Sequence, residues 1–148
     1  MSISSTINDQ IKQAMLAKDK DRLAALRDIK AKILLEATSG SGTEVSDDVA
    51  IKICQKLFKQ RMETYELYVA QNRSDLANEE LLQAKVIEEF LPQQLTEDEI
   101  KKEIADAIAS LGVSGPQDMG KLMGYLTSKL AGKADGKVIS AQVRAALN

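Results

Sequence analysis

Residues 90–100 read Phe90-Leu91-Pro92-Gln93-Gln94-Leu95-Thr96-Glu97-Asp98-Glu99-Ile100, and within them one helical pattern ends and another begins. Pro92 has no N–H and disfavours the α conformation of the residue before it, so the incoming helix should end just ahead of it. Thr96 and Glu99 then form the Thr-x-x-Glu pattern of a capping box at the start of a new helix. The stretch therefore predicts two domains, residues 1–91 and residues 92–148.

The composition favours helix along the whole chain. The protein has 148 residues, of which 44% are hydrophobic, 28% charged and only 3% aromatic. A chain of this kind can bury an ordinary core, and its shortage of strand formers favours helices over a sheet. We expect an all-α protein with an amino-terminal helical domain, whose last helix is a linker helix, and a carboxyl-terminal three-helix bundle.

Several classes of chemistry are excluded by what the sequence lacks. Cys54 is the only cysteine and there is no histidine, which excludes an internal disulfide, a Cys/His zinc site and a histidine acid or base. No Gly-Lys-Ser/Thr ending marks a phosphate-binding loop. We expect no metal and no cofactor. The uncharged stretches are too short to span a bilayer, so we expect a cytoplasmic protein that does not bind membranes.

Apolar periodicity predicts four helices before the break, each with an expected cap. They are residues 4–18 capped by Ser4 or Ser5, a second helix capped by Asp19 or Asp21 and ending near Ala37, a third from Ser46 to Val69, and a fourth from Ser74 to Phe90. The residues expected to face the core are Ile3, Ile7, Ile11 and Met15, then Leu23, Leu26, Ile29, Ile33 and Leu34, then Ile51, Cys54, Phe58, Met62, Tyr65 and Val69, then Leu76, Leu81, Leu82, Val86, Ile87 and Phe90.

Two surface features accompany these helices. The basic face of the second helix, made of Arg22, Arg27, Lys30 and Lys32, is interpreted as a solvated surface, with an RNA contact as the alternative. Residues 38–43 are rich in Ser and Gly and predict a flexible loop.

After the break the pattern predicts three short helices. The first should end at Gly112 in the left-handed conformation, the second should follow Ser114-Gly115-Pro116 and end at Gly132, and Asp135 should cap the third. The net charge of -2 gives no global attraction to nucleic acid and no reason to expect DNA as a partner. Residues 115–148, however, carry five basic and two acidic side chains, so the carboxyl end is locally basic.

The second of these short helices contains two glycines, Gly120 and Gly124, one turn apart. A glycine inside a helix costs about 1 kcal/mol relative to alanine, so some contact should offset that cost. Two small residues on one face let another backbone approach closely. That backbone is either a neighbouring helix, which is the favoured interpretation, or a ligand such as a phosphodiester chain.

Five stretches together point to a known family. They are Lys59-Gln60-Arg61, Arg73-Ser74-Asp75-Leu76-Ala77, Phe90-Leu91-Pro92-Gln93-Gln94-Leu95, Asp118-Met119-Gly120-Lys121-Leu122-Met123-Gly124 and Gly132-Lys133-Ala134-Asp135-Gly136. Over nearly the whole chain the sequence resembles the GatB/YqeY family, specifically its stand-alone YqeY-like members. The last two stretches are the most specific.

The resemblance implies two helical domains joined by a partly helical linker, the second being similar to the tail domain of the GatB component of tRNA-dependent amidotransferases. In those enzymes the tail helps to hold tRNA, and the family label reads carbon–nitrogen ligase with glutamine as amido donor. This chain itself supplies no catalytic constellation. We therefore expect at most an accessory to a larger amidotransferase or synthetase complex, and not an autonomous enzyme.

Two hypotheses for function remain open. The first is a non-catalytic module that binds structured RNA, with tRNA as the expected partner. The phosphates would be contacted by the basic side chains of the tail and the backbone would approach at the glycines, without base stacking because aromatic residues are so few. The candidate RNA-binding residues are Gly120, Lys121, Gly124, Lys129, Lys133, Lys137 and Arg144. The alternative is a helical protein–protein interaction module with no RNA ligand, which would use the methionines of the same helix or the exposed edge of the long third helix.

Overall fold

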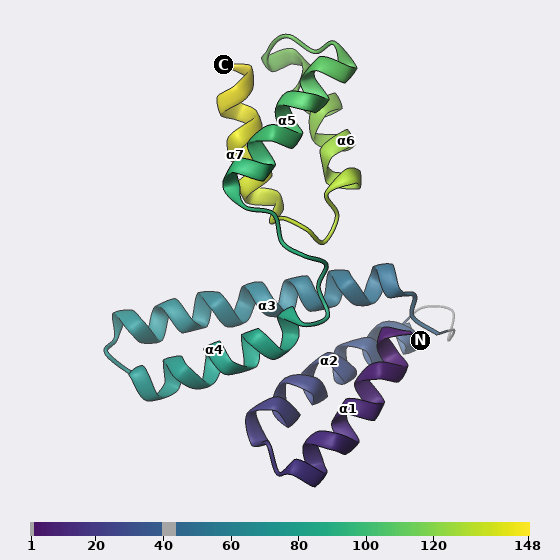
Figure 1. Ribbon diagram of the computed structural model, residues 1–148, viewed down its shortest axis with the longest axis vertical. Helices are drawn as coiled ribbons and strands as arrows, with labels where there is room; N and C mark the ends of the chain where they lie inside the picture. The colour runs from purple at the N-terminus through teal and green to yellow at the C-terminus, as the bar shows by residue number, and fades with distance from the viewer. Residues whose placement is uncertain (1, 40–43) are drawn as a thin grey trace. The chain divides into compact units, whose positions relative to one another are not determined.

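The computed structural model describes residues 2–39 and 44–148, and it is all-α over that part of the chain (Figure 1). The described elements are α1 (Ile3–Ala17), α2 (Lys20–Ser39), α3 (Asp47–Ala70), α4 (Ser74–Glu88), α5 (Glu97–Leu111), the 3₁₀ turn η1 (Pro116–Asp118), α6 (Met119–Lys129) and α7 (Gly136–Leu147). The expectation of an all-α protein is confirmed. Residues 40–43 of the predicted Ser/Gly loop lie outside the described residues.

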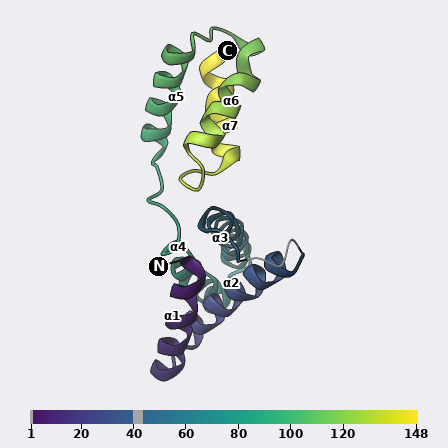
Figure 2. The ribbon, with the colours of Figure 1, turned by 90° about the vertical axis from the view of Figure 1, so that its right-hand side faces the viewer.

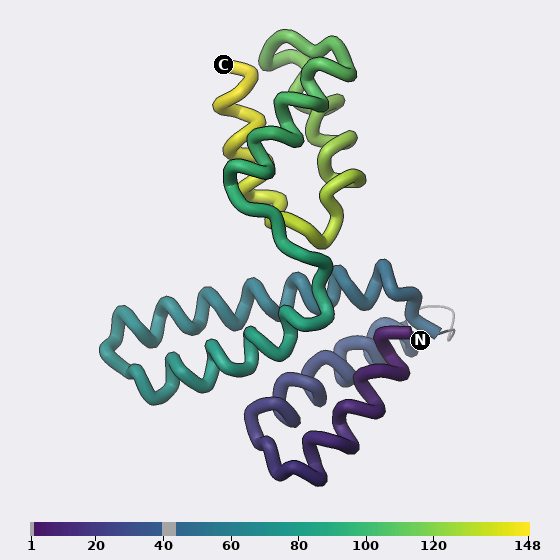
Figure 3. The backbone as a smooth tube through the Cα atoms, in the orientation of Figure 1, coloured from purple at the N-terminus to yellow at the C-terminus, as the bar shows by residue number. Residues whose placement is uncertain are grey.

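Contacts divide the chain into two compact units, Met1–Leu91 and Pro92–Asn148. In the amino-terminal unit, α1 packs on α2, and the long helix α3 packs on α4 (Figures 1 and 3). The two pairs share one core, because α2 also packs on α4 and α3. The side chains buried most completely there include Ile7, Leu26, Ile29, Cys54 and Ile87.

Four side chains that the periodicity placed in this core are instead half-exposed: Met15, Leu34, Val69 and Leu82. A step of four residues advances about 400° around a helix, so a seam built from such steps drifts roughly 40° at each one. Ile7 is buried, whereas Met15, two such steps further on, has left the buried face. The seam of α3 does not drift in this way, because it combines steps of three and four, and Val69 is instead exposed in the last turn of that helix.

Two predicted caps are wrong by a few residues. The first helix begins at Ile3, and the Ser2 hydroxyl, not that of Ser4 or Ser5, accepts the capping hydrogen bond, from the Ser5 N–H at 3.1 Å. Ser74 does not cap α4, since it is already the first helical residue and Arg73 precedes it without a side-chain cap. The turn before α4 is too short to hold a separate cap, because the N–H of Arg73 still bonds the Tyr68 carbonyl of α3.

The other two caps fall where the pattern placed them. Asp19 accepts from the Arg22 N–H at 3.2 Å, and Ser46 caps α3 by accepting from the Val49 N–H.

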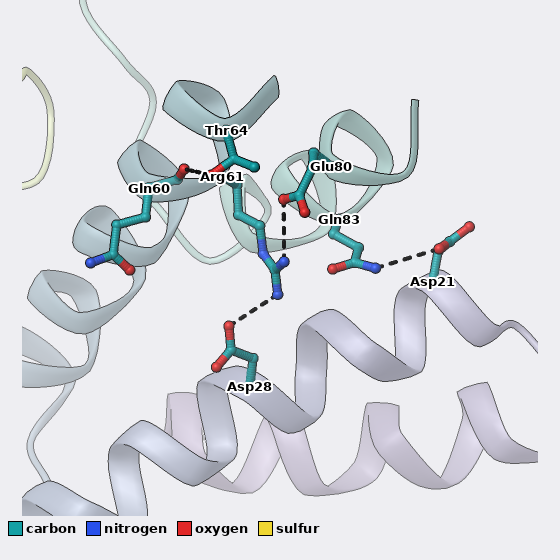
Figure 4. A network of polar contacts seen from close by, with 7 residues as sticks. All are labelled: Asp21, Asp28, Gln60, Arg61, Thr64, Glu80 and Gln83. Atoms are coloured by element: carbon teal, nitrogen blue, oxygen red, sulfur yellow. Dashed lines mark hydrogen bonds and ion pairs between the residues drawn. The ribbon is translucent and has the colours of Figure 1, made fainter. Parts of the chain in front are cut away.

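A polar network joins three helices of this unit (Figure 4). The guanidinium of Arg61 on α3 pairs with Asp28 of α2 at 3.0 Å and with Glu80 of α4 at 3.3 Å. Beside it, the Gln83 amide of α4 donates to Asp21 of α2 at 3.5 Å. One arginine side chain therefore ties the α1–α2 pair to the α3–α4 pair.

Replacement of Arg61 should destabilise the amino-terminal unit. The Arg61 side chain is only 22% exposed, so Arg61→Met leaves Asp28 and Glu80 facing each other with no counter-charge, at a cost of about 1–3 kcal/mol. Arg73→Met is the matched control, because the Arg73–Asp75 pair is 54% and 67% exposed and should contribute almost nothing. Urea unfolding of both variants measures the difference, and equal costs would contradict the bridging role of Arg61.

Cys54 is completely buried in the core of this unit. Burial raises the pKa of its thiol from 9.0 to about 11. Between these values the unfolded chain loses the proton while the folded chain keeps it, so ionisation of the thiol favours unfolding as the pH rises.

The unfolding free energy should therefore fall between pH 9 and pH 11 by more in the wild type than in Cys54→Ala, which has no thiol to ionise. Urea unfolding of the two proteins at several pH values tests this expectation. Parallel pH profiles would mean that the thiol ionises as readily in the folded chain as in the unfolded one.

In the carboxyl-terminal unit, most of the helix caps predicted from the local sequence are present. Thr96 and Glu99 form the reciprocal capping box, and Gly112 ends α5 in the left-handed conformation with φ 65°. Asp135 caps α7 by accepting from the Lys137 N–H at 3.1 Å. Pro116 opens a 3₁₀ turn and not an α-helix, and the Asp118 carboxylate there accepts from the Ser114 N–H at 3.1 Å.

The three helices of this unit enclose a second core. Its most deeply buried large side chains are Ile104, Leu122, Leu126, Ile139 and Val143, contributed by all three helices. None of the described helices is long and apolar enough to cross a membrane.

Candidate nucleic-acid interface

The glycines of α6 face solvent. Gly120 and Gly124 are exposed, and a Cβ added at either position would meet no atom within 4 Å. The interpretation that they let a neighbouring helix pack closely is therefore wrong for the described helices of the carboxyl-terminal unit, none of which contacts either position. The conformational cost of both glycines is not offset by any packing contact in the described part of the chain.

Around the two glycines, the surface of α6 lies close to the helix backbone and is open to solvent. Ser128 lies one turn beyond Gly124 on the same side, and Thr127 is a further exposed short side chain, whereas the longer exposed side chains of Lys121 and Tyr125 each directly follow a glycine. We call Gly120, Gly124 and Ser128 the α6 shelf. Because its side chains are absent or short, an approaching molecule can reach the helix backbone itself. Lys121 is exposed at the edge of the shelf.

Two of the candidate cations lie on α7. Lys137 and Arg144 are exposed and seven residues apart, which places them on the same side of that helix. Gln142 lies on the other side, where its amide donates to the Glu97 carbonyl at the start of α5 at 3.4 Å. Lys137 and Arg144 therefore point away from α5.

The α6 shelf also points away from α5. Lys129 reaches across to Glu103 of α5, and the two glycines lie about 140° and 180° around α6 from it. Helices α6 and α7 pack side by side within this unit (Figure 2). The α6 shelf and the two α7 cations consequently border the same face of the three-helix bundle, which we call the α6–α7 face.

Lys133 lies in the connection between these helices, and its backbone is held on two sides. Its carbonyl accepts from the Leu95 N–H at 2.9 Å, and the neighbouring Gly132 carbonyl accepts from the Gln94 side-chain amide at 2.6 Å. Gly132 itself takes the left-handed conformation with φ 77°. The sequence pattern did not reveal this role of Gln94, which anchors the α6–α7 connection.

Lys129 differs from the other candidate cations. Its ammonium pairs with the Glu103 carboxylate at 3.0 Å and lies 5.7 Å from the centre of the Tyr125 ring. The hydrogen bond to Glu103, and then the charge of that carboxylate, raise the pKa of Lys129. No described carboxylate forms an ion pair with the side chains of Lys121, Lys133, Lys137 or Arg144. Lys129 is thus the one candidate whose charge is already compensated within the described residues.

The methionines of α6 do not form an exposed surface. Met119 and Met123 are half-buried and pack against the core of the unit. An adaptable methionine patch, on which the protein-interaction alternative relied, is therefore not present on α6. Within residues 2–39 and 44–148, no group of three or more Cys, Asp or Glu side chains could hold a metal ion.

Comparison with known proteins gives a family match along almost the whole chain. The sequence profile of the family described as "Yqey-like protein" matches residues 4–147. The similar curated proteins are yeast proteins named "Altered inheritance of mitochondria protein 41, mitochondrial".

That of Lachancea thermotolerans is 26% identical over 114 residues, which is 76% of this chain and 61% of the relative. That of Vanderwaltozyma polyspora is 31% identical over 85 residues, which is 57% of this chain and 46% of the relative. The match to the Kluyveromyces lactis protein is 24% identical and covers 95% of this chain and 74% of the relative. The first two matches thus span only about half to three fifths of the relatives' length.

Proposed function

The chain belongs to the YqeY-like family, and on that premise we propose that it is a non-catalytic module that binds structured RNA, with tRNA as its ligand. The observation that carries the proposal is the α6–α7 face. An open helix surface without side chains at Gly120 and Gly124 adjoins cations that no described carboxylate compensates. The resemblance of this unit to the amidotransferase tail domain supplies the ligand class.

The face suits a phosphodiester backbone because it combines close approach with positive charge. A duplex or a folded RNA can lie against the α6 shelf, where no side chain holds it away from the helix. The surrounding cations then contact phosphates, which fixes the position of the RNA without reading its sequence. Recognition of this kind responds to the shape of the RNA.

The number of uncompensated cations sets the expected salt dependence. Lys121, Lys133, Lys137 and Arg144 can neutralise about four phosphates, whereas Lys129 remains paired with Glu103. Release of about four counterions lowers the affinity roughly a hundredfold between 50 and 200 mM salt. A much shallower dependence would mean that the bound RNA does not lie along these side chains.

Replacing both glycines with alanine tests the α6–α7 face directly, because the unfolding free energy should rise while the affinity for RNA falls. Gly120→Ala/Gly124→Ala should stabilise the unit by about 1–2 kcal/mol, since the added methyl groups meet open space and the helix propensity improves. The same methyl groups should weaken RNA binding, because they hold the phosphodiester chain away from the helix backbone.

Thermal unfolding and anisotropy titration of the double variant measure the two effects. Gly136→Ala is the matched control for the added methyl group, since Gly136 also faces open space but lies at the start of α7. A double variant that is more stable and binds tRNA as tightly as the wild type would contradict backbone approach at the α6 shelf.

We further propose that the protein acts as an accessory to a larger amidotransferase or synthetase complex and carries out no chemistry by itself. The resemblance to the tail domain supports this role, since in those enzymes other domains carry the reaction. We propose the cytoplasm as its compartment, whereas the name of the yeast relatives assigns those proteins to mitochondria.

A further inference from the structure

We propose that Tyr125 is a stacking platform for one unpaired base of the bound RNA, so that the ligand presents an unpaired nucleotide next to a double-helical part. This inference rests on the proposed function and makes it more specific. It also revises the expectation that binding involves no base stacking, which followed from the small number of aromatic residues.

The position of Tyr125 on α6 is the first argument. It is the one aromatic residue among the large hydrophobic side chains exposed in the described part of the chain, and 37% of it is accessible. It follows Gly124 directly and lies one turn after Lys121, about 40° around α6 from Lys129, at the exposed edge of α6 that borders α5. An aromatic ring therefore stands beside a low surface, with a cation nearby that can hold the phosphate of a stacked nucleotide.

The surroundings of the ring are the second argument. The Lys129 ammonium lies over one face of the ring, 5.7 Å from its centre, and is held in place by Glu103 at 3.0 Å, so a base would stack on the other face. Glu103 belongs to α5, so the arrangement connects two helices and limits the movement of the lysine. A ring whose neighbours are already ordered loses less conformational entropy when a base stacks on it.

The chemistry then defines the ligand. Stacking of a base on an aromatic ring contributes about 1–3 kcal/mol and tolerates all four bases, because each base has a π face. A paired base inside a duplex cannot offer that face. The site should therefore distinguish RNA with an unpaired nucleotide from blunt duplex RNA, while remaining indifferent to which base is unpaired.

Two RNAs test the inference: a blunt-ended hairpin whose two strands are joined by a non-nucleotide linker and which therefore has no unpaired base, and the same hairpin extended by four unpaired nucleotides that include 2-aminopurine. Anisotropy titrations would compare the wild type with Tyr125→Leu and with Tyr125→Phe, which keeps the ring. Tyr125→Leu should bind the extended hairpin about tenfold more weakly and the blunt hairpin unchanged, and Tyr125→Phe should resemble the wild type. The wild type should also quench the 2-aminopurine fluorescence, a readout that does not depend on whether any variant folds.

The outcomes distinguish failure of the stacking role of Tyr125 from failure of RNA binding itself. If the wild type binds both hairpins equally and leaves 2-aminopurine unquenched, the stacking role is overturned while RNA binding stands. If Tyr125→Leu weakens both hairpins alike, the ring supports the interface but does not read an unpaired base. If the wild type binds neither RNA, the proposed function fails and this inference fails with it.

Discussion

Leu126→Ala should lower the unfolding free energy of the carboxyl-terminal unit by about 2–5 kcal/mol. The Leu126 side chain is completely buried among the three helices of that unit, so its truncation leaves a cavity that the surroundings refill only in part. A domain of this size has an unfolding free energy of roughly 3–9 kcal/mol. One such substitution is therefore enough to populate the unfolded state of the unit.

Hydrogen exchange followed by mass spectrometry measures where the loss occurs. We expect protection to fall across α5, α6 and α7 and to persist in α1–α4, since the two cores share no buried residue. Leu67→Ala is the control with the same chemistry, because Leu67 is exposed on α3 and its truncation should cost less than about 0.5 kcal/mol. Loss of protection in both units after Leu126→Ala would show that they unfold as one.

The double reversal Lys121→Glu/Lys133→Glu should weaken tRNA binding about a hundredfold. A cation and a phosphate at about 4 Å attract each other by roughly 1 kcal/mol in water, and reversal of the charge turns this attraction into repulsion of similar size. Two reversed contacts therefore cost roughly 3–4 kcal/mol before salt screening reduces the effect. The fold should be unaffected because both side chains are exposed.

The matched control reverses two exposed lysines of the amino-terminal unit, Lys12→Glu/Lys85→Glu, and so changes the net charge of the protein by the same amount. Anisotropy titration of both double variants with tRNA at 50 mM salt separates the local effect from the global one. Equal losses would mean that net charge alone governs binding. Retention of affinity by the first variant would remove these two lysines from the interface.

The features that local sequence decides were predictable. The capping box of Thr96 and Glu99, the left-handed Gly112 and the cap at Asp135 each depend on residues within one turn of one another, so the sequence displays them directly. The burial of particular side chains was less predictable, since it depends on how far around a helix its neighbours reach. Met15 and Leu34 continue an apolar pattern beyond the partner that could cover them.

In the candidate site, too, the features set by local sequence were predictable and those set by the packing of the helices were not. The spacing of Gly120 and Gly124 indicated a face that allows close approach, but whether a helix or solvent occupies it depends on the rotation of α6 in the bundle. The pairing of Lys129 with Glu103 joins residues far apart in the sequence, and no local pattern reports it. The exposure of Tyr125 was harder to predict, because it lies only about 60° and 100° around α6 from Leu122 and Leu126, which are both buried.

The central claim is that the α6–α7 face binds structured RNA. Its most direct test is an anisotropy titration of the purified full chain with tRNA and with a random single-stranded RNA of equal length, each at 50 and 200 mM salt. We predict micromolar or tighter binding that prefers tRNA and weakens roughly a hundredfold between the two salt concentrations. No binding, or equal binding of the two RNAs, would contradict the claim and would direct the search to protein partners.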